Sequence, residues 1–123
     1  MGIHEKFFLI EDDHRDAQDI FSEMARAGHE VVGYADNLQD ATELVSKIEE
    51  SGASVIVLDG NLSPRRSDCE EGKEIAKLIK SKNPDMSIIA HSGSSKEAAC
   101  YGDIYIKKPS FGELAKAVTA IPR

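Results

Sequence analysis

The alternation of short apolar runs with amphipathic stretches is the feature that most constrains the fold of this chain. Runs of mainly hydrophobic residues recur along it, at 6–10, 31–34, 55–58, 87–90 and 104–106. Runs without polar alternation are typical of strands that are buried on both faces, as in a parallel sheet. The chain is therefore expected to contain five such strands.

Between these runs the hydrophobic period becomes helical. The pattern predicts helices near 14–27 and 38–50, a third through Ile75–Ile79, and a last one after Ser110. Asn37 is the expected cap of the second helix. The segment Ser110–Glu113 has the pattern of a capping box that opens the last helix. The stretch 92–102 is too short for a long helix, so a helix there is expected to be short or missing.

This order of elements predicts a flavodoxin-like, doubly wound α/β fold. The parallel sheet would have five strands in the order 2-1-3-4-5, with helices on both faces. Right-handed crossovers leave few other ways to wind such a chain. Binding sites in these folds lie outside the carboxyl ends of the strands, beside strands 1 and 3.

The length and net charge of the chain limit the classes of function that it can have. A chain of 123 residues is expected to form one domain over 1–123, and with its end at Arg123 no output domain is expected. The net charge of −7 disfavours direct binding to nucleic acid or to an anionic membrane. No apolar run is long enough to span a bilayer, and no signal peptide opens the chain. Cys69 and Cys100 are expected to be free thiols, so the expected location is the cytoplasm.

Acidic residues follow two strands that the predicted topology makes neighbours. Glu11 and Asp12 follow the first strand, and Asp59 follows the third. Two carboxylates about 4 Å apart repel by around 4 kcal/mol at an effective dielectric constant near 20. A hard divalent cation with oxygen ligands relieves this repulsion, and Mg²⁺ suits a site with few carboxylates. The cluster predicts a Mg²⁺ site, with a lysine nearby and a hydroxyl from Ser92.

These motifs together resemble the receiver domain of bacterial two-component response regulators. The matching segments are Phe8–Asp13, Val55–Asp59, Ile88–Gly93 and Tyr105–Pro109, in the same order and on the same elements over nearly the whole chain. The resemblance implies a phosphoacceptor that receives its phosphoryl group from a histidine kinase or a phosphotransfer protein. It would signal to a downstream protein, by contact or by phosphoryl relay, without being an enzyme in its own right.

The resemblance also implies a role for each site residue. Asp59 would accept the phosphoryl group, and Mg²⁺ would be held by Glu11, Asp12, Asp59 and the backbone carbonyl of Asn61. Lys108 would pair with Asp59 and then with the phosphoryl oxygens. Ser92 would donate a hydrogen bond to the phosphoryl group, and Tyr105 matches the aromatic switch position. Pro109 matches the proline that follows the lysine.

Some assignments have alternatives. Asp13 is either a metal ligand or, as favoured, the start of the first helix. Lys107 and Lys108 point to opposite faces of a strand, and the spacing to Pro109 favours Lys108. His91 is interpreted as a strand-end residue rather than a phosphorelay histidine. Tyr105 also fits plain core packing.

The chain departs from the family pattern in two places. The loop after Asp59 is longer than usual and carries Arg65 and Arg66, whereas the stretch from Ser92 to Lys108 is shorter. Because this stretch is shorter, it is in question whether the chain signals through the family's usual surface. The shorter stretch also predicts that phosphorylation orders residues 92–106, and that partners contact this edge together with the loop at 64–68.

The sequence is compatible with two other functions. A pseudo-receiver would keep the fold as a protein-binding module without a phosphorylation cycle. A small phosphatase or phosphotransferase of the haloacid-dehalogenase type would use Asp59 as nucleophile, but it needs a second acid two residues later, where Asn61 stands.

Overall fold

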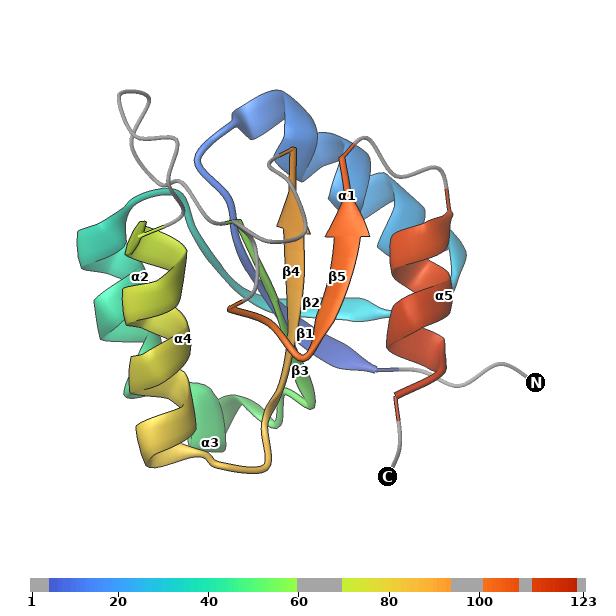
Figure 1. Ribbon diagram of the computed structural model, residues 1–123. Coiled ribbons are helices and arrows are strands. Elements are labelled where there is room, and N and C mark those ends of the chain that lie inside the picture. The colour runs from blue at the N-terminus through green and yellow to red at the C-terminus, as the bar shows by residue number, and fades with distance from the viewer. Residues whose placement is uncertain (1–4, 60–69, 94–100, 109–111, 122–123) are drawn as a thin grey trace.

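The computed structural model describes residues 5–59, 70–93, 101–108 and 112–121, except for the side chain of Glu49. The strands form one parallel sheet in the order β2-β1-β3-β4-β5 (Figure 1). Their bounds are β1 Lys6–Ile10, β2 Glu30–Ala35, β3 Val55–Leu58, β4 Ser87–Ser92 and β5 Ile104–Lys107. The predicted flavodoxin-like order is therefore confirmed.

The helices cover both faces of the sheet. They are α1 His14–Arg26, α2 Leu38–Val45, α3 Ile48–Ser51, α4 Glu70–Lys82 and α5 Glu113–Thr119. Helices α1 and α5 lie on one face, and α2 and α4 lie side by side on the other (Figure 1). None of the helices in the described ranges is long and apolar enough to cross a membrane.

The core has two halves because successive strand residues point to opposite faces of the sheet. In β1, Phe7 and Leu9 pack with α1 and α5, whereas Phe8 and Ile10 pack on the side of α2 and α4. All four side chains are buried. The continuous apolar runs follow from this burial on both faces.

The predicted single helix over 38–50 is wrong, because two helices are observed there. Asn37 caps α2 as expected, and its side chain accepts a hydrogen bond from the Asp40 amide at 2.8 Å. The helix ends at Val45, where the amides of Ser46 and Lys47 bond carbonyls three residues earlier. The Ser46 hydroxyl also donates to the carbonyl of Glu43. These local bonds compete with continuation of the helix, and α3 follows as a separate turn.

The last helix begins later than the predicted capping box over 110–113 requires, and Ser110, the expected cap, lies outside the described residues. Helix α5 begins at Glu113, and the residue in the cap position is Gly112, which provides no side-chain hydrogen bond. A carboxylate from another helix takes that role, since Glu23 of α1 accepts the Ala115 amide at 2.8 Å. A contact between two helices thus stabilises the start of α5.

Residues 101–103, between β4 and β5, are anchored to the sheet and are not helical. The Asp103 amide donates to the Ile88 carbonyl, and an Asp103 carboxylate oxygen accepts from the Ile88 amide. Gly102 lies so close to β4 that an added Cβ would be 2.6 Å from the Ala90 nitrogen. Gly93 and 101–103 therefore fit the expectation of a short or missing helix, while the predicted turns over 94–100 lie outside the described residues.

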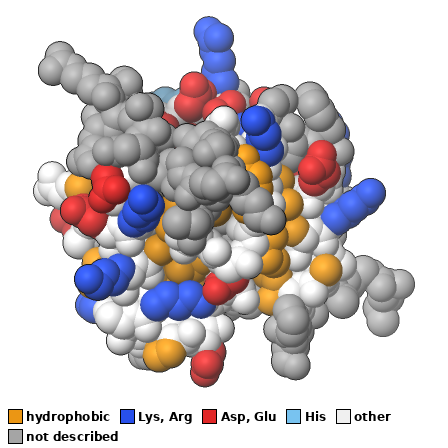
Figure 2. Space-filling model, viewed as in Figure 1, with side chains coloured by type: hydrophobic (Ala, Val, Ile, Leu, Met, Phe, Trp, Pro, Cys, Tyr) orange, Lys and Arg blue, Asp and Glu red, His pale blue; other side chains and the backbone are white. Residues whose placement is uncertain are grey.

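Strand β5 forms one edge of the sheet, and its apolar side chains are only half-buried. Ile104, Tyr105 and Ile106 all fall in this class, whereas the equivalent positions of β3 are buried. Figure 2 shows hydrophobic side chains in the middle of the face that presents β4 and β5.

Candidate functional site

Backbone hydrogen bonds between neighbouring strands continue one residue beyond the strand ends and so position the site residues. The Glu11 amide donates to the Ala35 carbonyl, and the Asp59 amide donates to the Ile10 carbonyl at 2.8 Å. On the other side of the sheet, the Lys108 amide donates to the Ser92 carbonyl at 3.0 Å. Residues far apart in the sequence therefore meet at the carboxyl edge of the sheet.

Three carboxylates gather there. One oxygen from each of Glu11, Asp12 and Asp59 lies within 4.8 Å of the others. Glu11 and Asp59 are buried, and Asp12 is half-buried. The structure thus brings together the acids that the sequence placed at the ends of β1 and β3.

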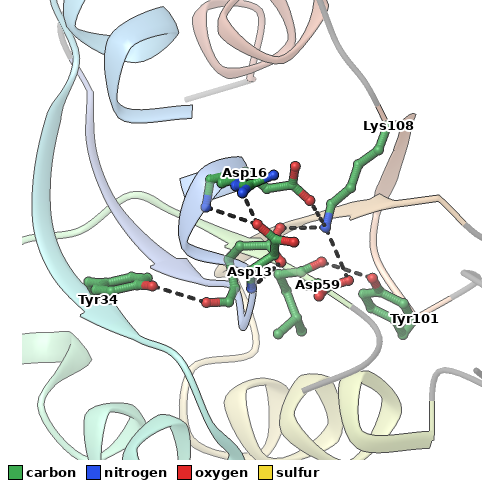
Figure 3. A network of polar contacts seen from close by, with 9 residues as sticks. Asp13, Asp16, Tyr34, Asp59, Tyr101 and Lys108 are labelled. Carbon is green, nitrogen blue, oxygen red and sulfur yellow. Dashed lines mark hydrogen bonds and ion pairs between the residues drawn. The ribbon is translucent and has the colours of Figure 1, made fainter. Parts of the chain in front are cut away.

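Lys108 supplies the positive charge beside these acids (Figure 3). Its ammonium nitrogen lies 2.5 Å from Glu11 Oε1, 3.3 Å from Asp16 Oδ2 and 3.5 Å from Asp59 Oδ1. Lys107, the alternative, ends β5 with an exposed side chain. Lys108 is therefore the lysine that lies in the cluster, although its shortest contact is with Glu11 rather than with Asp59.

Asp13 has the structural role favoured from the sequence. Its Oδ1 accepts hydrogen bonds from the amides of Arg15 and Asp16, at 2.9 and 3.1 Å, as the cap of α1. These bonds hold the pKa of Asp13 below its usual value. Its own amide donates to Glu11 Oε2, so the cap also orients a carboxylate of the cluster.

Burial and the charges of neighbouring groups shift the pKa values of the residues in the cluster. Burial, followed by the charge of Glu11, raises the pKa of Asp59 to about 9. Burial also raises the pKa of Glu11, with Lys108 acting against the shift. Although burial lowers the pKa of Lys108, the Asp59 and Glu11 carboxylates outweigh it and raise that pKa to about 12. One lysine therefore does not offset the charge of the buried acids.

The donor set fits Mg²⁺. All three side chains offer carboxylate oxygens, the ligands that Mg²⁺ prefers. Among the described residues, buried Glu11 Oε1 receives no hydrogen bond and has only its ion pair with Lys108. A buried charged oxygen with so few partners favours an added cation. Asn61, the expected source of a backbone carbonyl ligand, lies outside the described residues.

No family model and no curated protein matches the sequence, but solved structures match its fold. A signal receiver domain of a modulated diguanylate cyclase from Desulfovibrio desulfuricans G20 aligns with a TM-score of 0.73 and 19% identity, covering 94% of this chain and 91% of that one. The response regulator TrrA from Thermotoga maritima, solved with Mg²⁺ and BeF, aligns with a TM-score of 0.73 and 24% identity, covering 93% and 96%. The receiver domain of Francisella response regulator 1452 aligns with a TM-score of 0.70 and 26% identity, covering 93% of each chain.

The chain has the fold of a response regulator receiver domain.

In this receiver fold, Ser92 and Tyr105 occupy the positions expected from the sequence. Ser92 ends β4, next to β3, and only 1% of its surface is exposed. Tyr105 lies in β5 opposite Ala90 and packs against it. Pro109 and the loop with Arg65 and Arg66 lie outside the described residues.

His91 is a buried strand residue of the receiver fold, as interpreted. Neither ring nitrogen has a hydrogen-bond partner among the described residues, and burial, followed by the charge of Lys108, lowers the His91 pKa to about 4. The ring borders a cavity of about 690 Å³ that is also lined by Lys108 and residues of α1 and α5. The imidazole is thus neutral near pH 7.

Three residues at the site were not predicted from the sequence. Asp16 contacts Lys108, Tyr34 donates its hydroxyl to the Glu11 carbonyl at 3.2 Å, and Tyr101 donates to the Leu58 carbonyl at 2.8 Å (Figure 3). Tyr101 thereby ties the segment before β5 to the residue that precedes Asp59. The spacing of Asp16, one turn after the Asp13 cap, was a usable signal; the two tyrosine contacts join distant segments and had none.

Proposed function

We propose that this chain is a Mg²⁺-dependent phosphoacceptor that is phosphorylated on Asp59 within a two-component signalling system. The observation that carries the proposal is the cluster of Glu11, Asp12 and Asp59 with the Lys108 ammonium beside it. This arrangement lies at the carboxyl edge of a receiver fold, where its strands place a binding site.

In the proposed reaction, an Asp59 carboxylate oxygen attacks the phosphorus of a phosphohistidine. An oxygen–phosphorus bond forms, the nitrogen–phosphorus bond breaks, and its electron pair stays on the donor imidazole. Lys108 stabilises charge on the transferred phosphoryl oxygens, and the Ser92 hydroxyl donates a hydrogen bond to one of them. Positioning and electrostatics of this kind account for most of the catalysis in phosphoryl transfer.

Glu11, Asp12 and Asp59 are the side chains that would hold Mg²⁺. When bound, the ion would supply positive charge that stabilises the phosphoryl group as charge develops on it. The Asp59 carboxylate would then be ionised near pH 7, which its raised pKa otherwise opposes.

The test is incubation with acetyl phosphate and Mg²⁺, followed by intact mass measurement. We expect a single phosphoryl adduct that requires Mg²⁺ and is absent in Asp59→Asn. Asp19→Asn is the matched control, because it removes an exposed carboxylate of α1 outside the cluster. The absence of an adduct in the wild-type chain would favour the pseudo-receiver alternative, and turnover of a free phosphomonoester would favour a phosphatase.

The proposal extends to the partners. The donor is a histidine kinase or a phosphotransfer protein of the cytoplasm, and the output is contact with a downstream protein or phosphoryl relay. The half-buried apolar side chains of β5 support an output surface at this edge, where Ser92 and Tyr105 would link it to the phosphorylation site.

A further inference from the structure

Asp16 is the third acidic residue whose carboxylate forms an ion pair with Lys108. Its Oδ2 is 3.3 Å from the Lys108 ammonium, slightly closer than Asp59 Oδ1 at 3.5 Å. Asp16 belongs to the first turn of α1, and its amide is bonded to the Asp13 cap at 3.1 Å. The carboxylate is therefore held on the helix side of the lysine, away from β3 (Figure 3).

Three carboxylates compete for the Lys108 ammonium. A lysine has three N–H donors, and Glu11, Asp16 and Asp59 each lie within ion-pair distance of Lys108. A phosphoryl group on Asp59 adds negative charge and acceptor oxygens on one side of the lysine. Movement of Lys108 towards these oxygens weakens its attraction to the other carboxylates, and Asp16 is the most exposed of its three partners.

We propose that Asp16 is a positioning residue that draws Lys108 towards α1 and so opposes its movement onto the phosphoryl group. This inference rests on the proposed function. Because Asp16 is partly exposed, its attraction for the lysine is modest, and its removal changes an equilibrium by about two- to fivefold.

The decisive comparison is Asp16→Asn against the wild-type chain, with beryllofluoride as the phosphoryl mimic. At saturating Mg²⁺, we expect beryllofluoride to bind about two- to fivefold more tightly to Asp16→Asn, because Lys108 is freer to contact the mimic. Without beryllofluoride, we expect Mg²⁺ to bind more weakly to this variant. Lys108 then pairs more fully with Glu11 and Asp59, which are the acids proposed to hold the ion. Structural damage would weaken both equilibria, whereas loss of the Asp16 charge alone would act equally in a Lys108→Ala background. Opposite directions that disappear in the Lys108→Ala background therefore identify a positioning role.

Two variants serve as controls. Asp19→Asn removes a carboxylate from the same helix, beside the same cavity, with no ion pair to Lys108 among the described contacts. Asp16→Glu keeps the charge and is expected to restore both affinities towards the wild-type values. Asp16→Ser tests the same contact if Asp16→Asn does not fold.

The outcomes distinguish failure of the proposed function from failure of the role of Asp16. A wild-type chain that binds no beryllofluoride and accepts no phosphoryl group would overturn the proposed function and this inference with it. A wild-type chain that binds beryllofluoride, with Asp16→Asn matching Asp19→Asn or binding the mimic more weakly, would overturn the role of Asp16 alone.

Discussion

The Lys108 ammonium lies 2.5 Å from Glu11 Oε1 but 3.5 Å from Asp59 Oδ1. The lysine is therefore paired most closely with an acid expected to hold the metal, rather than with the expected phosphoacceptor. In this arrangement its charge partly offsets the charge of the acids, as a bound cation would. Cation binding and lysine position are thus expected to be coupled through Glu11.

Mg²⁺ is expected to stabilise the fold, because it relieves repulsion among Glu11, Asp12 and Asp59. A ligand at a hundredfold excess over its dissociation constant adds about 2.7 kcal/mol to the free energy of unfolding. Thermal melts with increasing Mg²⁺, against Na⁺ at equal ionic strength, measure the effect. Without metal, Asp12→Asn should be neutral or stabilising. A melting temperature that does not respond to Mg²⁺ would contradict the metal site.

Stability without Mg²⁺ is expected to fall as the pH rises. The pKa of Asp59 is about 9 in the folded chain, well above its ordinary value of 3.8, so the folded state holds a proton that the unfolded state releases. The stabilisation is complete below pH 4 and is lost as the pH rises towards 9. Chemical unfolding across this range measures how steeply the free energy of unfolding falls with pH. Asp59→Asn should reduce this slope, and Asp19→Asn should leave it unchanged. Equal slopes in all three chains would rule out this origin.

Lys108 and Lys107 are expected to differ sharply despite being adjacent. Lys108→Ala should keep some phosphorylation but lose the conformational response, and Lys108→Arg should not restore it, because a guanidinium differs from a compact ammonium in shape and hydration. Without Mg²⁺, Lys108→Ala should lower the free energy of unfolding by up to about 3 kcal/mol, the low end for breaking a buried ion pair. The lower figure applies because Glu11 and Asp59 can take up protons.

Lys107→Ala is the matched control and should change neither property, since its side chain is exposed. Intact mass measures phosphorylation, amide hydrogen exchange with and without beryllofluoride measures the conformational response, and denaturant unfolding measures the free energy of unfolding. Greater damage from Lys107→Ala would contradict the placement of Lys108 in the cluster.

Gly102→Ala is expected to destabilise the chain by about 1–3 kcal/mol, the usual cost of overpacking. The added Cβ would lie 2.6 Å from the Ala90 nitrogen and 2.9 Å from its Cβ, and neither atom can move without shifting β4. Gly93→Ala is the control, because its added Cβ meets nothing within 4 Å. Denaturant unfolding measures the difference, and equal stability of the two variants would show that 101–103 is not packed on β4.

Much of the fold and part of the site were predictable from the sequence. Strands buried on both faces need continuous apolar runs, and such runs ended just before Glu11 and Asp59. The alternation of elements then implied that β1 and β3 are neighbours, which placed the acids together. The cap of α2 by Asn37 was also predictable, because it is a contact within a few residues.

Contacts between distant segments were decided only by the tertiary structure. The amide of Ala115 is bonded by Glu23 of α1, which no pattern near α5 indicates. The choice of Glu11 as the nearest partner of Lys108 depends on where β1, β3 and β5 end relative to one another. Local sequence determines which residues are polar and where each strand ends, whereas distances of a few ångströms between side chains depend on the packing of the whole sheet. Ion-pair energies vary steeply over those distances, so the partition of Lys108 among its three acids is a property of the folded chain.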